Sequence, residues 1–217
     1  MGLFDKKYCD ICGEKIGLLG NKKLADGNLC KNCEKKLSPW FSERRESTVD
    51  DIRLQLGYRK NNEARVEAFN ISESYGQYGN LLIDNDMKAI IVTNSSNWRS
   101  TNPDVVDFKD ITGCQYSISD SQSEIYKKGA DGKDESYNPK CYKHSYCFTI
   151  QIFVRNEFFD DMSFRLNPSS SVEMSDQPLV NDRIKADPEK LADYRKYKAM
   201  AEEVVAKVLA LKESAAE

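Results

Sequence analysis

Four cysteines near the start of the chain constrain its fold more than any other feature. They form two Cys-x-x-Cys pairs, Cys9 with Cys12 and Cys30 with Cys33, separated by seventeen residues. Two such pairs are typical of a structural zinc site, because tetrahedral Zn²⁺ takes four thiolate ligands at about 2.3 Å. Gly13 follows the first pair, where a residue without a side chain allows a tight bend. The sequence therefore predicts one zinc ion held by all four cysteines.

The residues around these pairs indicate a small finger over residues 1–40. Lys22 to Leu29 is expected to form a hairpin that turns at Asp26-Gly27, and a helix is expected to begin after the second pair, near Glu34. This order is that of a treble-clef finger, and a zinc ribbon with a strand after the second pair is the alternative. A pair of disulfides is a further alternative. No signal peptide precedes the first pair, and cytosolic thiols stay reduced, so the disulfides are disfavoured.

A site made only of cysteines leaves no coordination position for water or substrate. The metal is therefore expected to be structural and not catalytic. A segment of about forty residues buries too little apolar surface to fold alone. Metal binding is then expected to supply its folding free energy, which is on the order of 10–16 kcal/mol in zinc-finger peptides.

Composition and charge exclude several classes of protein. The 217 residues are 40% hydrophobic and 31% charged, and no stretch approaches the roughly 20 apolar residues of a membrane span. The sequence also has no secretory signal and no complete myristoylation pattern, so a cytoplasmic protein is expected. The net charge of −3 argues against a protein that coats nucleic acid. Residues 1–60 are mildly basic, with 13 Lys and Arg against 9 Asp and Glu.

Residues 41–69 are expected to form a helical connector. Ser47 is suited to an N-cap, and the apolar residues that follow recur on one helical face, namely Val49, Ile52 and Leu56. Gly57 and the Asn61-Asn62 pair weaken the pattern. A break near residue 60 and a second short helix are therefore expected.

From residue 70 onward the apolar residues alternate, which favours strands. The expected strands are 80–84, 87–93, 111–118, 145–154 and 160–166, with a turn at Asn85-Asp86 and a polar hairpin tip at 127–140. Residues 167–186 are expected to be a loop. Asp187 and Pro188 then open a helix that should run to about Lys212, with an apolar stripe wide enough to cover a sheet.

Antiparallel strands followed by one C-terminal helix is the order of a pleckstrin-homology-like (PH-like) barrel. The runs Leu81 to Thr93 and Val105 to Cys114 resemble bacterial PH-like and GRAM-like domains. In those domains a strand ending in Val-Thr is followed by a hydrophobic residue, an acid and an Ile that leads into the next strand. The resemblance implies an α+β chain in which residues 70–217 form a PH-like antiparallel β-barrel, closed by the helix at 187–212.

The segment from Cys9 to Phe41 closely resembles the start of a bacterial family of unknown function. Its members begin Cys-x-x-Cys-Gly-Glu-Lys-Ile-Gly-Leu-Leu-Gly, continue through Asp-Gly-x-Leu-Cys-x-x-Cys and reach Lys-Lys-Leu-Ser-Pro-Trp-Phe, as this chain does. The resemblance implies a zinc module and no particular activity.

Other candidate chemistry is sparse. The only histidine lies in Cys141-x-x-His144-x-x-Cys147, and with Cys114 these residues could form a second metal site. Against this, Cys141 and Cys147 would point to the opposite side of a strand from His144, and small buried apolar positions suit Cys114 and Cys147. Walker, G-x-G-x-x-G, G-x-S-x-G and H-E-x-x-H motifs are absent from the sequence. We therefore expect no enzymatic activity.

These observations predict a non-catalytic zinc-binding adaptor or scaffold. The finger would be its structural and interaction module, the PH-like domain its protein-binding platform, and another protein its partner. A peripheral phospholipid-binding protein at the cytoplasmic membrane face is one alternative, although the acidic balance of residues 70–217 is opposite to what headgroup binding favours. Nucleic-acid binding through the finger is the other. The sequence does not fix the oligomeric state.

Overall fold

The structure, a computed structural model, describes residues 6–76, 80–168 and 171–215. The helices are α1 (Lys31–Glu34), α2 (Val49–Ala68) and α3 (Ala192–Ser214), with 3₁₀ turns η1 (Trp98–Thr101), η2 (Phe108–Asp110) and η3 (Pro188–Lys190). The strands are β1 (Lys7–Tyr8), β2 (Lys15–Ile16), β3 (Asn21–Lys23), β4 (Asn28–Cys30), β5 (Glu73–Tyr75), β6 (Leu81–Asp84), β7 (Ala89–Val92), β8 (Val105–Asp107), β9 (Ile111–Lys128), β10 (Asp134–Val154), β11 (Asp161–Arg165), β12 (Glu173–Ser175), β13 (Gln177–Leu179) and β14 (Asp182–Ile184). Every described strand pairing is antiparallel, so the expected α+β class is confirmed.

The finger consists of two small hairpins and a single helical turn. β1 pairs with β2, and β3 pairs with β4 with Lys22 opposite Leu29, as the sequence predicted. Helix α1 begins directly after Cys30, whose Sγ accepts a hydrogen bond from the backbone N–H of Cys33. The finger has its own apolar cluster, and one member of that cluster, Ile52, comes from α2.

Helix α2 is continuous, so the prediction of two short helices was wrong. It passes through Gly57 without a break, and Thr48 rather than Ser47 is its N-cap, in a capping box with Asp51. Its buried residues follow one stripe, Ile52, Gln55, Arg59, Asn62 and Val66. The middle of this stripe is polar. These polar side chains bond to partners far along the chain. The apolar periodicity of the sequence alone therefore did not predict that the helix is continuous.

Strands β5 to β8 form one four-stranded antiparallel sheet in chain order. The predicted hairpin is confirmed, with Leu81 opposite Val92 and Asp84 opposite Ala89. Both faces of its central strands, β6 and β7, are buried. One face packs against Val66 and Phe69 at the end of α2, and the other faces the main core.

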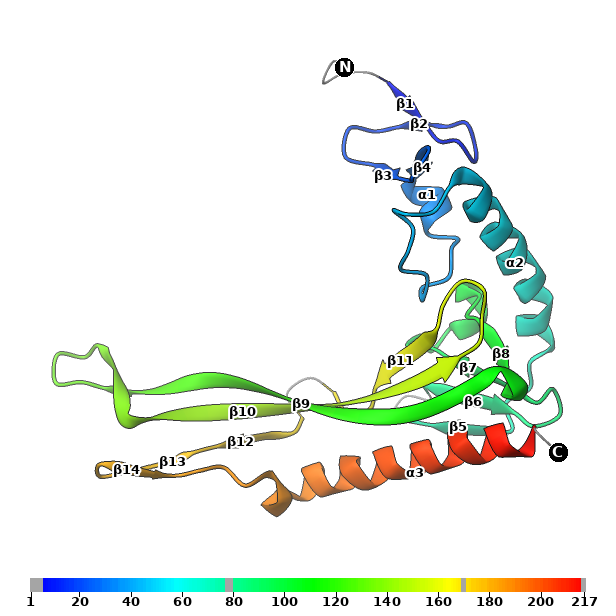
Figure 1. The fold of residues 1–217 in the computed structure, drawn as a ribbon. Coiled ribbons are helices and arrows are strands. Elements are labelled where there is room, and N and C mark those ends of the chain that lie inside the picture. The colour runs from blue at the N-terminus through cyan, green and yellow to red at the C-terminus, as the bar shows by residue number, and fades with distance from the viewer. Residues whose placement is uncertain (1–5, 77–79, 169–170, 216–217) are drawn as a thin grey trace.

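Strands β9, β10 and β11, together with β12, form a second antiparallel sheet. The prediction that alternate residues of β10 face inward is confirmed, since Phe148, Ile150 and Ile152 are fully buried. The expected barrel is not formed, because among the described strands no pairing joins β5–β8 to the sheet of β9–β12. β9 and β10 pair with each other almost throughout and leave the core together (Figure 1), so their outer parts do not reach the first sheet.

The outer parts of β9 and β10, residues 119–145, form with residues 173–185 a projection that we call the arm (Figure 1). The strands predicted at 111–118 and 145–154 were too short, because β9 continues to Lys128 and β10 starts at Asp134. Residues 167–186, expected to be a loop, contain β12, β13 and β14. Polar contacts link neighbouring strands of the arm, for example the ion pairs of Lys140 with Glu124 at 2.9 Å and of Lys143 with Glu173 at 2.6 Å. Hydrophobic alternation could not detect them.

Helix α3 lies along the main core, as its apolar stripe predicted (Figure 1). Asp187 accepts a hydrogen bond from the N–H of Glu189, but it opens the 3₁₀ turn η3, and α3 proper starts at Ala192. The buried side chains of α3 are Tyr194, Tyr197, Ala201, Val204, Val208 and Leu211.

Candidate metal centre

The four cysteines of the finger lie close together. Their Sγ atoms are all within 4.8 Å of one another, and the Sγ atoms of Cys12 and Cys30 are 3.7 Å apart. Two sulfurs bound to one tetrahedral ion at about 2.3 Å are about 3.8 Å apart, so this separation fits a shared metal. All four are free thiols in the structure, not disulfides. They could therefore bind a metal ion, and they form the single His/Cys/Asp/Glu cluster of this kind among the residues described.

Local backbone geometry brings the two pairs together. The N–H of Cys30 donates to Sγ of Cys9 at 3.3 Å, and this bond joins the second pair to the first. Gly13 has a φ of +74°, a left-handed conformation that favours glycine, and its N–H closes the first turn on the carbonyl of Cys9 at 2.8 Å. The bend predicted at Gly13 is thus confirmed.

The thiols differ in how readily they ionise. Burial raises the pKa of Cys9, but the backbone N–H groups of Cys12 and Cys30 outweigh this effect, and the net result is a pKa lowered to about 7. Burial, followed by the neighbouring thiols, raises the pKa of Cys33 above its ordinary value. Four thiolates in one cluster repel each other, and a bound dication is what would allow all four to ionise.

The finger is joined to the sheets by a buried polar network at the middle of α2. Arg59 Nη1 contacts Asp104 Oδ1 at 2.7 Å, and these side chains are only 6% and 0% exposed. Ser38 of the finger donates to the other carboxylate oxygen of Asp104 at 2.8 Å. Burial raises the pKa of Asp104, and Arg59 and Ser38 act against that rise.

Further bonds extend the same network. Arg59 also donates to the carbonyls of Lys36 and Asn102. Asn62 donates to the carbonyl of Pro103 at 2.8 Å and accepts from the N–H of Val105 at 3.0 Å. The network therefore connects the finger, α2 and the first sheet. The sequence did not predict this network, because Arg59 pairs with a residue 45 positions away and no local sequence pattern marks such a pair.

The second metal site considered from the sequence is not assembled. Cys141 is buried with its Sγ 3.8 Å from the carbonyl of Pro139, whereas Cys147 lies near Thr149. Cys114 and Cys147 were expected to be buried, but both are only partly buried. Burial raises the pKa of Cys114 to about 12.

His144 contacts two carboxylates in the arm instead of any thiol. Its Nδ1 lies 2.8 Å from Asp120 Oδ2, and its Nε2 lies 3.5 Å from Asp176 Oδ1. The two carboxylates are on opposite sides of the imidazole ring. These contacts therefore join the strands of the arm and do not converge on one ion.

Comparisons with known proteins bear on the finger alone. Residues 7–55 match the model of a family described as a domain of unknown function, DUF4428. This match covers the cysteine cluster and the start of α2, and it confirms the resemblance seen from Cys9 to Phe41. No curated protein and no solved structure matches the chain.

Among the described residues, none of the helices is long and apolar enough to span a membrane.

Proposed function

We propose that the finger binds one structural zinc ion through Cys9, Cys12, Cys30 and Cys33, and that the protein is a non-catalytic adaptor. The observation that carries this proposal is the cluster of four Sγ atoms within 4.8 Å. An all-thiolate donor set suits zinc, and once all four bind, no coordination position remains for a substrate. When bound, the ion would neutralise thiolate charge and stabilise the fold of the finger.

The arm is the part of the molecule best suited to be the protein-binding platform. It projects from the core (Figure 1) and carries exposed apolar side chains on β13, β14 and the turn between them, namely Leu179, Val180 and Ile184, of which Val180 is 93% exposed. Exposed apolar side chains on a projecting element favour a protein partner. The PH-like prediction is supported by strand order, since one meander from β5 to β8, a second from β9 to β11 and a C-terminal helix follow in sequence.

Elemental analysis of the purified protein tests the metal. We expect one zinc per chain, loss of the ion in Cys30→Ser, and full retention in the matched control Cys147→Ser, whose thiol lies outside the cluster. A metal-free folded protein would contradict the proposal. Two equivalents of zinc would contradict the single site.

Affinity capture from a native lysate with matched baits tests the adaptor role. Val180→Asp should lose specific partners that the wild-type chain retains. Leu54→Asp, which changes an exposed leucine on α2 (62% exposed), should retain them. Identical capture by all three baits would contradict a platform on the arm.

A further inference from the structure

The loop between β2 and β3 exposes two adjacent leucines at the tip of the finger. Leu18 is 84% exposed. Leu19 is 96% exposed, which is the highest value among the large hydrophobic side chains described. Gly17 and Gly20 flank them, and a hydrogen bond of 2.9 Å from the N–H of Gly20 to the carbonyl of Gly17 closes the turn. The backbone of the turn is therefore closed, while its two leucines stay almost fully exposed.

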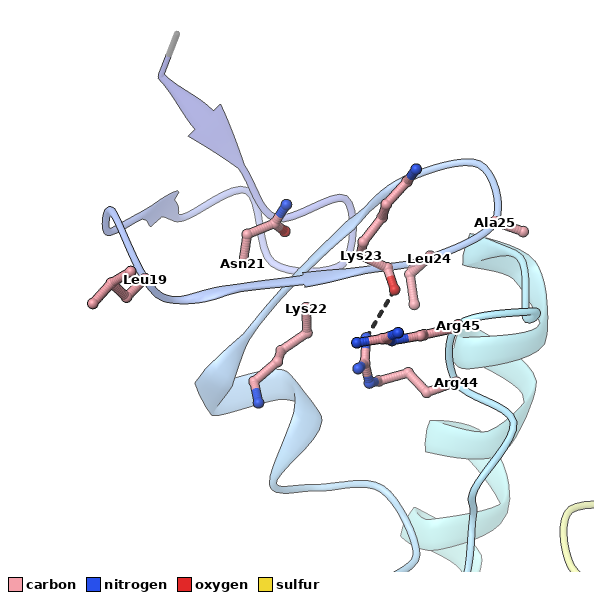
Figure 2. Close-up of a pocket in the computed structure, with 8 residues that line it drawn as sticks. All are labelled: Leu19, Asn21, Lys22, Lys23, Leu24, Ala25, Arg44 and Arg45. Carbon is pink, nitrogen blue, oxygen red and sulfur yellow. Dashed lines mark hydrogen bonds between the residues drawn. The ribbon is translucent and has the colours of Figure 1, made fainter. Parts of the chain in front are cut away.

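Cationic side chains gather directly beside this loop. A hollow of about 600 Å³ next to Leu19 is lined by residues that include Lys22, Lys23, Arg44 and Arg45. Figure 2 shows that Lys22, Arg44 and Arg45 lie on one side of β3, whereas the amine of Lys23 points to the other side. Arg44 is held in place by a hydrogen bond to the carbonyl of Lys23 at 2.8 Å. Leu19 thus borders the same hollow as these cations.

The cations in the hollow exceed the acids that neutralise them. Glu34 contacts both Lys22, at 3.0 Å, and Arg44, at 3.2 Å, so a single carboxylate serves two cations. Lys23 and Arg45 have no carboxylate at salt-bridge distance in the part of the chain that the structure describes, and both are exposed. The hollow therefore carries excess positive charge and would attract an anion.

We propose that this surface docks the protein on a membrane containing anionic phospholipid. Leu18 and Leu19 would enter the apolar layer, and Lys23 and Arg45 would contact the headgroup phosphates. Because Leu18 and Leu19 are almost fully exposed, a protein partner would need an apolar pocket ringed by acids to receive them. A bilayer presents an apolar layer beneath anionic groups without any shaped pocket. This proposal does not depend on the adaptor role, which rests on the arm.

Vesicle co-sedimentation of the full chain tests the proposal. We expect binding to vesicles of phosphatidylcholine mixed with phosphatidylglycerol and not to phosphatidylcholine alone. Leu18→Ser/Leu19→Ser should weaken binding at least about tenfold, because burying even one leucine changes an equilibrium by that factor. Lys23→Ala/Arg45→Ala should also weaken it. For the wild type, about 1 M salt should weaken binding, since it shortens the Debye length to about 3 Å.

Val180→Ser is the matched control, because it removes an equally exposed hydrophobic side chain from the arm. It should bind vesicles as the wild type does. The altered side chains are exposed, so circular dichroism should be unchanged in every variant. The proposal is overturned if the wild type stays in solution, if both vesicle types bind equally, or if the double serine variant binds as tightly as the control. Binding that Val180→Ser alone abolishes would assign the surface to the arm and would also overturn it.

Discussion

Replacing Asp104 with alanine should destabilise the protein more than any comparable change to a surface ion pair. The carboxylate is fully buried and accepts hydrogen bonds from Arg59 at 2.7 Å and Ser38 at 2.8 Å. Its removal leaves the Arg59 guanidinium, itself only 6% exposed, without a counter-charge. Breaking one partner of a buried ion pair costs about 3–5 kcal/mol, because the remaining charge stays desolvated.

This loss would be a large share of the free energy of unfolding, which is about 5–15 kcal/mol for a typical domain. The matched control is Lys128→Ala, which breaks an ion pair with Asp134 whose side chains are 72% and 61% exposed. An exposed pair of this kind contributes about 1 kcal/mol or less. The two variants should therefore differ by several kcal/mol.

Urea unfolding followed by circular dichroism measures both variants. The double variant Arg59→Met/Asp104→Leu should lose less stability than Asp104→Ala alone, because it leaves no unpaired buried charge. If Asp104→Ala costs no more than Lys128→Ala, the buried ion pair does not join the finger to the sheets, and the reasoning fails.

Three further predictions concern other parts of the chain. Hydrogen bonds from Asn85, Lys207 and Tyr75 lower the pKa of Glu73 from 4.5 to about 2, so its stabilising contribution is complete above pH 4.5 and is lost as the pH falls toward 2. In Glu73→Gln the urea midpoint should fall less over this range, and an unchanged pH dependence would contradict the assignment. Deleting residues 187–217 removes the buried side chains of α3, among them Val204, Val208 and Leu211, each worth about 1.5–3 kcal/mol. The truncated chain should therefore aggregate or melt far lower, and an unchanged melting temperature would place α3 outside the core. Chelation of the metal should unfold the finger, keep most of the β signal in circular dichroism and lower the melting temperature, whereas loss of the whole signal in one step would mean that the finger and sheets share one core.

The cysteine cluster and the β6–β7 hairpin could be predicted because their signals are local. A Cys-x-x-Cys pair fixes its own geometry through a single turn, and Gly13 marks the bend. Alternation along β10 likewise identified the inward face from Phe148 to Val154, which the structure confirms. These features needed no knowledge of distant residues.

The continuity of α2 and the length of the arm strands were missed because distant contacts stabilise them. Arg59 and Asn62 look like solvent-facing residues until Asp104 and Asn102 are placed beside them. β12 similarly looks like loop until Glu173 is set opposite Ser145. Polar helices and strands of this kind show no apolar periodicity, so their extent depends on tertiary contacts that the sequence pattern does not reveal.

The buried stripe of α2 also determines how the finger is rotated about the helix axis relative to the first sheet. Ile52 contacts the finger and Val66 contacts the first sheet, and both lie on the same side of a helix that turns about 100° per residue. Two inserted residues between them would rotate the finger by about 200° relative to the sheet and break the hydrogen bond from Ser38 to Asp104. Seven inserted residues would restore the phase to within about 20° and move the finger outward by about 10 Å. The orientation of the finger is therefore set by helical turns, while its distance from the sheets is set by the hydrogen bond from Ser38 to Asp104, which such a shift would break.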